Sequence, residues 1–157
     1  MKKQVVRTLT MVGLVNVLAM VVMVGAAHGQ SLGNKIRINI PFDFTVGNNK
    51  LPAGEYSIGR AQPSSGDTVL LISNVNEVAS VLPLTNAAQS VEPKHADTLV
   101  FHRYGDQYFL FQVWPAGATV GRVLPKSRSE RAVAQNVGYE AGAAVQKPKT
   151  VEIVKIY

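Results

Sequence analysis

Cysteine is missing from this 157-residue chain. Its absence excludes disulfide bonds, thiolate zinc sites, thiol nucleophiles and the lipidated cysteine of a bacterial lipoprotein. Charged residues are also scarce, at 17%, whereas apolar residues reach 46%. This balance is far from the polar, highly charged composition of disordered chains, and it indicates a packed core held by non-covalent contacts.

The common enzyme motifs are missing as well. The chain has no Gly-x-Ser-x-Gly elbow, no His-Glu-x-x-His, no P-loop and no dinucleotide-binding glycine fingerprint. Asp43 and Asp106 are interpreted as a solvated carboxylate and a turn carboxylate, since each lies on a polar strand face or in a turn. We therefore assign no catalytic residue and expect no cofactor.

The first 29 residues have the pattern of a secretory signal peptide. Lys2, Lys3 and Arg7 precede an apolar run over residues 9–24, and small residues follow it. This run has 16 residues, fewer than the about 20 that cross a bilayer as a helix. We expect export to the periplasm or the outside of the cell, with no membrane span in the mature chain.

Cleavage is predicted after Gly29, with cleavage after Ala27 as the alternative. The first choice leaves residues 30–157 as a single exported β domain, long enough to bury a core without disulfides. It removes three of the 16 basic residues and no acidic one, so 13 basic residues face 10 acidic ones, a net charge of +3. An exported domain with this small excess is not expected to bind nucleic acid.

The mature chain consists mainly of short strand patterns separated by turns. Residues 35–46 alternate apolar and polar side chains, the period of a β-strand. Pro41 has no amide hydrogen, which places this strand at a sheet edge or introduces a bulge. Further strands are predicted over residues 55–59, 68–73, 77–84, 119–124 and 150–157, and residues 85–97 are predicted to form a polar loop.

The clearest prediction is a β-hairpin over residues 98–114, with Gly105 and Asp106 as a two-residue type II′ turn. Both strands carry large apolar side chains on both faces, so we expect the hairpin to be central and covered on two sides. A two-residue turn fixes the register. The predicted facing pairs are His102 with Phe109, Val100 with Phe111, Phe101 with Leu110, and Arg103 with Tyr108.

One helix is predicted after the strands. Ser127 and Glu130 match a Ser-x-x-Glu capping box, and Gly138 can end the helix. Residues 141–148 form a small-residue linker. About eight strands and one short helix predict an all-β, single-domain β-sandwich or small β-barrel.

Four segments resemble a family of short exported hypothetical proteins seen in acidobacteria. The segments are IPFDFTVG at 40–47, LPAGEY at 51–56, LVFHRYGD at 99–106 and LPKSRSER at 124–131. Together they span most of the mature chain. The resemblance implies one exported β domain whose helix follows the last central strand, and it implies no mechanism because the family has no assigned activity.

His95, Asp97 and His102 could supply three ligands to zinc if they converged. His95 is predicted in a loop and His102 in the middle of a strand. We interpret His102 as a structural histidine packed by Phe109, and His95 as an exposed side chain, so no metal site is predicted.

A basic cluster is formed by Arg122, Lys126, Arg128 and Arg131, with only Glu130 among them. Arg128 would lie in the first helical turn, where a cation opposes the helix dipole by about 0.3–1 kcal/mol. Helix stability therefore does not explain its position. A solvated helix face is the simpler interpretation, and contact with an anionic surface such as a phosphate-bearing envelope polymer is the functional one.

Tyr108 and Trp114 are the candidate ligand platform, because sugar-binding sites use these side chains when they are exposed on one face. Arg103 is expected to stack on Tyr108 or extend along it rather than bind an anion. The phenylalanines of the hairpin are expected in the core.

These features favour an exported, non-enzymatic β domain that acts as an envelope or secreted interaction or structural module. An anionic envelope polymer or another envelope protein would be its partner. A small-ligand-binding β-barrel is the alternative and requires a cavity. An outer-membrane β-barrel is less favoured, because spanning strands need about 9–11 residues each. A hydrolase whose Asp, His and Ser residues meet only in three dimensions also remains open.

Overall fold

The computed structural model describes residues 35–62, 68–76, 80–140 and 147–155. The predicted signal peptide and both of its cleavage positions lie outside these residues. The same holds for residues 77–79 of a predicted strand, 141–146 of the predicted linker, and 156–157 of the last predicted strand.

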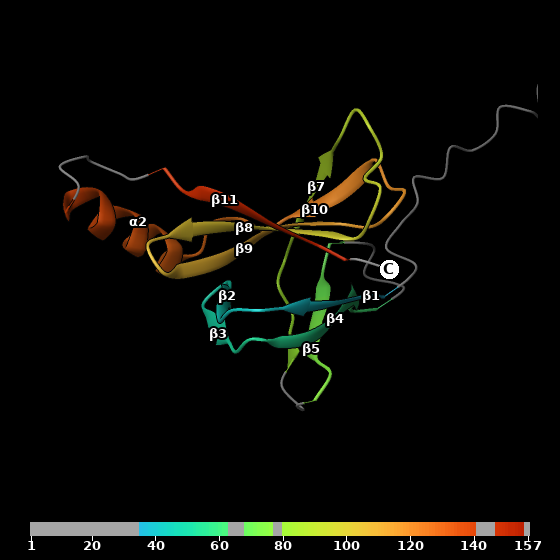
Figure 1. The fold of residues 1–157 in the computed structure, drawn as a ribbon, viewed down its shortest axis with the longest axis horizontal. Coiled ribbons are helices and arrows are strands. Elements are labelled where there is room, and N and C mark those ends of the chain that lie inside the picture. Colours follow the sequence, from blue (N-terminus) through green and yellow to red (C-terminus); the bar gives the residue numbers. More distant parts are fainter. Residues whose placement is uncertain (1–34, 63–67, 77–79, 141–146, 156–157) are drawn as a thin grey trace, which may run out of the picture.

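Two β-sheets form the fold (Figure 1). Sheet A has the order β1-β4-β5-β6, with every neighbouring pair antiparallel. Its strands are β1 (Ile36–Ile40), β4 (Gly54–Arg60), β5 (Leu70–Asn74) and β6 (Ser80–Val81).

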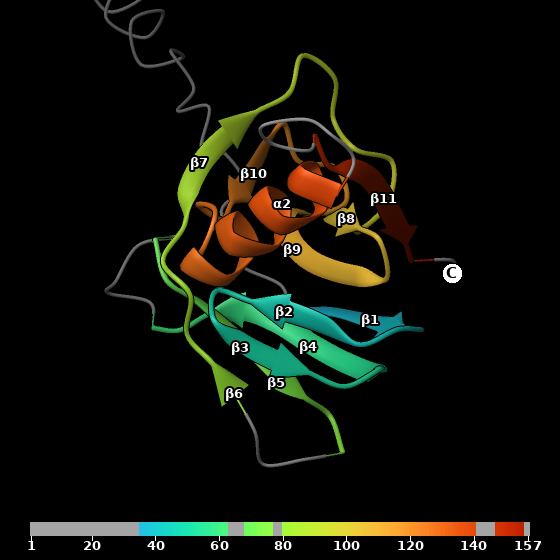
Figure 2. The ribbon, with the colours of Figure 1, turned by 90° about the vertical axis from the view of Figure 1, so that its left-hand side faces the viewer.

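Sheet B has the order β11-β8-β9-β10-β7. These strands are β7 (Asn86–Gln89), β8 (Thr98–Tyr104), β9 (Gln107–Trp114), β10 (Val120–Val123) and β11 (Lys149–Val154). A small ribbon of β2 (Phe44–Val46) and β3 (Asn49–Leu51) joins sheet B, because β2 pairs in parallel with β9. The helix α2 (Arg128–Glu140) lies over sheet B, while sheet A lies below it in Figure 2.

The main core lies between the two sheets. Sheet A contributes the inward-facing residues of β1, β4 and β5, and sheet B contributes Leu99, Phe101, Leu110 and Val113. A smaller cluster on the other face of sheet B packs α2 against Tyr104 and Phe109. The predicted all-β fold is thus confirmed in its sandwich-like form, with eleven strands among the described residues rather than about eight.

The predicted single strand over residues 35–46 is wrong at Pro41. The chain leaves β1 at Ile40 and begins β2 at Phe44, which pairs within sheet B. Pro41 cannot donate a ladder hydrogen bond, so the break falls where the backbone chemistry requires it. The apolar alternation survives the break, because Phe44 and Val46 are still buried in the same core as Ile40. As expected for a strand that ends at proline, β1 lies at the edge of sheet A.

The hairpin of β8 and β9 is confirmed as central and covered on both faces. Gly105 has φ +57°, and no described residue other than glycine has a positive φ, so Asp106 follows in an ordinary conformation. Three of the four predicted pairs are present in β8 and β9. The fourth is wrong: Val100 faces Gln112, because a bulge after Val100 makes Phe111 an extra residue.

The predicted polar loop over residues 85–97 contains a strand. Asn86 to Gln89 form β7 and pair with β10, Gln89 facing Val120 and Asn86 facing Val123. Alanine, asparagine and glutamine have low strand propensity, so only the free edge of β10 explains this pairing.

The last strand was predicted from periodicity, and β11 confirms it by pairing with β8 and placing Val151 and Ile153 against the core.

Candidate functional site

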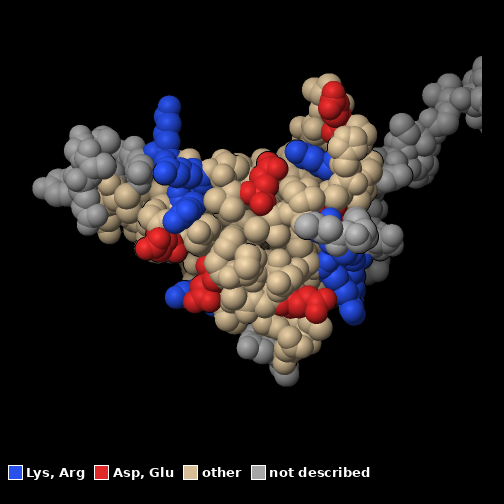
Figure 3. Space-filling model, viewed as in Figure 1, with Lys and Arg blue, Asp and Glu red and all other residues tan. Residues whose placement is uncertain are grey.

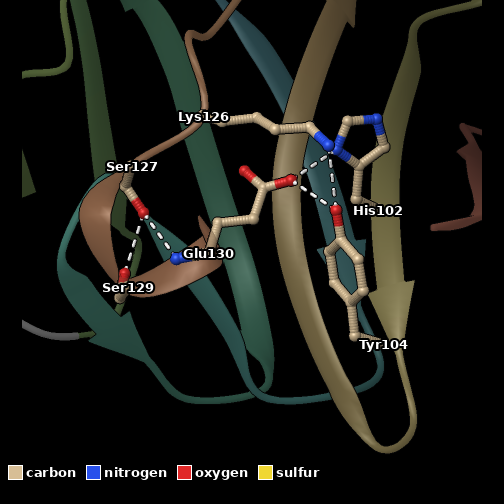
Figure 4. A network of polar contacts seen from close by, with 6 residues as sticks. All are labelled: His102, Tyr104, Lys126, Ser127, Ser129 and Glu130. Carbon is tan, nitrogen blue, oxygen red and sulfur yellow. Dashed lines mark hydrogen bonds and ion pairs between the residues drawn. The ribbon is translucent and has the colours of Figure 1, made fainter. Parts of the chain in front are cut away.

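The helix α2 begins as predicted but uses only half of the capping box. The Ser127 Oγ accepts a hydrogen bond from the Glu130 amide at 3.1 Å, which is the expected N-cap contact. The Glu130 carboxylate does not return to Ser127 and instead points toward sheet B (Figure 4). The helix also continues past Gly138 to Glu140, so the predicted end at Gly138 is wrong.

The carboxylate of Glu130 is the centre of a polar network that joins α2 to β8 (Figure 4). Its Oε1 lies 2.7 Å from His102 Nδ1 and accepts a hydrogen bond from the Tyr104 hydroxyl at 3.2 Å. The Lys126 ammonium donates to the same hydroxyl at 3.1 Å. Two strand residues, one helix residue and one residue of the preceding connection are thereby held together.

The network is buried apart from its lysine. Glu130 is 5% exposed to solvent, His102 is 6% exposed and Tyr104 is 1% exposed. Burial raises the pKa of Tyr104 above its usual 10.0, because the phenolate would lose its hydration. The Lys126 hydrogen bond lowers this pKa in part, and the negative charge of Glu130 raises it.

This raised pKa predicts a loss of stability at alkaline pH. The folded protein keeps the Tyr104 proton above about pH 10, where the unfolded chain releases it, so the free energy of unfolding falls as pH rises. Tyr104→Phe should cost about 1 kcal/mol at neutral pH through its lost hydrogen bonds. Above about pH 10, the free energy of unfolding of the Tyr104→Phe variant should fall less steeply with pH than that of the wild type. The difference between the two slopes should reach up to about 1.4 kcal/mol per pH unit. Urea unfolding measured across this range would test the prediction, and parallel pH profiles would contradict it.

The His102 side chain is buried, as its interpretation as a structural histidine requires, but Phe111 rather than Phe109 stacks on its ring. The His102 and Phe111 rings stack at 3.9 Å between centroids, on the same face of the hairpin as Phe109. Asp97 is buried elsewhere, where it accepts the Ala116 amide at 2.9 Å. Five residues of extended chain separate Asp97 from His102, a span of about 16 Å. Within the described ranges, no three His, Asp or Glu side chains group closely enough for a metal ion.

The network combines groups that also occur in catalytic sites, namely a histidine oriented by a carboxylate beside a tyrosine and a lysine. Here these groups are enclosed between α2 and the sheet. Three pockets on the described surface, with volumes of about 230 to 300 Å³, are lined by other residues. The arrangement therefore joins α2 to β8 through buried hydrogen bonds.

A second set of contacts fixes the start of α2. The Ser129 Oγ donates to the Gly47 carbonyl at 3.1 Å and lies 3.4 Å from Asn48 Oδ1, in the turn between β2 and β3. Gly47 has φ +63°, a conformation that favours glycine. The first turn of α2 is thus attached both to β8 and to the β2–β3 turn.

The predicted basic cluster is divided by the fold. Arg128 and Arg131 are exposed on α2, Lys126 bends back to Tyr104, and Arg122 faces Val113 on the opposite face of sheet B from the helix. Within the described part of the chain, Arg128 and Arg131 form no ion pair, and Glu130 is turned away from both. Figure 3 shows Lys and Arg side chains gathered at the end of the molecule where α2 and β11 lie.

The predicted ligand platform is not assembled. Trp114 is 5% exposed, its indole N–H donates to Gln112 at 3.0 Å, and the Lys94 ammonium lies over its ring at 5.7 Å. Tyr108 points to the other face of the sheet, where Phe42 stacks on it at 3.9 Å. The bulge at Phe111 shifts the alternation along β9, so Tyr108 and Trp114, although six residues apart, lie on opposite faces of the sheet and do not share an exposed face. The expected stacking of Arg103 on Tyr108 is present, at 5.3 Å.

Asp43 and Asp106 line one surface pocket of about 260 Å³, together with Lys50 and Tyr108. Each carboxylate has a local partner. Asp43 accepts the Ala53 amide at 3.0 Å and pairs with Lys50 at 3.5 Å, and Asp106 lies 3.5 Å from Arg103. These contacts are those of turn and surface carboxylates, in agreement with the sequence interpretation.

The comparisons with known proteins give no relative: no family model, no curated protein and no solved structure matches the chain. In the ranges that the structure describes, no helix has the length and apolarity to cross a membrane.

Proposed function

We propose that this protein is an exported, non-enzymatic β-domain module of the bacterial envelope or the secreted fraction, which binds an anionic envelope polymer through α2. The basic and apolar pattern of residues 1–29 supports export. The resemblance of four segments to exported acidobacterial proteins supports the same location.

The observation that carries the proposal is the exposed pair Arg128 and Arg131 on a helix whose position is fixed. Residues three apart lie on the same side of a helix. On the buried side, Glu130, Val133, Ala134 and Val137 face sheet B. Because the arginines are presented by a rigid element, little backbone entropy is lost when they contact repeated phosphate groups.

Charge reversal tests the proposal. Arg128→Glu combined with Arg131→Glu should weaken retention on a phosphate-bearing matrix at least fivefold at low salt, about 1 kcal/mol. Lys147→Glu with Lys149→Glu is the matched control, because it changes the net charge equally on exposed lysines outside α2. The α2 variant should stay folded, since Glu in the first helical turn is favoured by the helix dipole. Equal loss of retention in both double variants would reject α2 as the contact surface.

A further inference from the structure

The outer face of sheet A carries a pocket of about 230 Å³ that sequence reasoning did not identify. Its lining includes the basic residues Lys35, Arg37 and Arg60 and the hydroxyl-bearing residues Ser57 and Ser73. No acidic side chain is among the described residues that line it. The pocket lies on sheet A, away from α2, and Figure 3 shows a second group of Lys and Arg side chains near the start of β1.

Strand register places three of these side chains in one row. Arg37 of β1 faces Ser57 of β4, and Ser57 faces Ser73 of β5. Their neighbours Ile36, Ile58 and Ile72 point into the core, so the row of Arg37 and the two serines points to solvent. Directly facing side chains in antiparallel strands are about 5 Å apart, so a single small group can contact an arginine and a hydroxyl together.

Gly59 lines the pocket beneath Lys35. A Cβ atom at this position would lie 3.1 Å from Lys35 Cγ, so the aliphatic part of Lys35 crosses directly over the glycine. The lysine stem forms a wall at one side, and the short serine side chains leave the floor open. Lys35 and Arg37 are exposed and form no ion pair with any described residue. Glu55 is the nearest carboxylate along β4 on this face, and it is opposite Asn39 rather than Arg37.

We infer that this pocket, defined by Lys35, Arg37, Ser57, Ser73 and Arg60, binds a phosphate or sulfate group. Such a tetrahedral oxyanion matches the two-pronged donor geometry of Arg37, the point charge of Lys35 and the hydroxyl donors of the serines. The group would come from an ester on an envelope polymer or from the free ion. The site is separate from Arg128 and Arg131 and does not depend on the proposed role of α2.

Amide NMR titration of the purified protein with inorganic phosphate, inorganic sulfate and glycerol phosphate, at constant ionic strength, tests this site. We expect saturable shift changes centred on Arg37, Ser57 and Ser73, with a dissociation constant of about 1–10 mM for the free ions. Tighter binding of glycerol phosphate would identify an ester as the ligand, and tighter binding of a free ion would identify that ion.

Four variants separate a built site from general charge attraction. Arg37→Gln should weaken binding at least tenfold, whereas Lys147→Gln, which removes the same charge from an exposed residue outside both proposed surfaces, should leave it unchanged. Ser57→Ala with Ser73→Ala should weaken it about threefold with no change in net charge. Glu55→Gln should strengthen it, because a negative charge is removed from the same face. Non-saturable shifts over all basic surfaces, or equal effects of Arg37→Gln and Lys147→Gln, would overturn the inference while leaving the matrix test of α2 intact.

Discussion

Glu130→Ala should lower the free energy of unfolding by about 3–5 kcal/mol, a large share of the total stability of a small domain. The substitution removes the acceptor shared by His102 Nδ1 and the Tyr104 hydroxyl and leaves both groups buried. It also opens a cavity under the first turn of α2. The N-cap contact from Ser127 uses the backbone amide and is not removed, so the loss reports the carboxylate.

Urea unfolding of three further variants makes this prediction specific. Glu152→Ala removes an exposed carboxylate from β11 and should change the free energy of unfolding by less than about 0.5 kcal/mol. Glu130→Gln keeps the volume and one acceptor, and it should cost about 1–2 kcal/mol. His102→Ala combined with Glu130→Ala should cost less than the sum of the two single changes, because the partners lose the same contact. A cost below about 1 kcal/mol for Glu130→Ala would contradict the assigned role.

The elements predicted correctly from the sequence are those whose signal is local. The two-residue turn at Gly105 set the register of β8 and β9 up to Phe101, and Ser127 marked the start of the helix. The predicted pairing is wrong beyond Phe101, because nothing in the amino-acid sequence distinguishes a bulge at Phe111 from a regular strand. Across Pro41 the alternation of apolar and polar side chains continues, which predicts one strand, but the hydrogen bonding of the strand is interrupted. Only the alternation can be read from the sequence as a period.

The candidate sites were predictable to a smaller extent, because they depend on which strands are neighbours. The exposed arginines of α2 follow from the helix prediction and its apolar stripe. The contacts of Glu130 with sheet B were not predicted, since a capping box and a buried hydrogen-bonded carboxylate require the same residue at the same position. Arg37 was visible on the polar side of its strand, but its proximity to Ser57 and Ser73 is set by the order of sheet A.

Gly121 is the glycine whose replacement should disturb the fold most. A Cβ atom there would lie 2.5 Å from Cδ2 and Cε3 of Trp114, closer than carbon atoms approach without displacement. The ring has little room to move, because it is 5% exposed, hydrogen-bonded to Gln112 and covered by Lys94. Backbone movement is also restricted, since β10 pairs with β9 on one side and β7 on the other.

Gly121→Ala should therefore cost about 1–3 kcal/mol, and Gly121→Val more, with a red shift in the emission of the only tryptophan. Gly59→Ala is the control: it is a buried strand glycine too, but its 3.1 Å neighbour is the flexible stem of Lys35, which can move away. In the Trp114→Leu background the added methyl group meets no ring, so Gly121→Ala should cost less than about 0.5 kcal/mol there. An equal loss of unfolding free energy in the Trp114→Leu background would contradict this explanation. The destabilisation would then arise from the β10 backbone, and contact with Trp114 would not be the reason for glycine at this position.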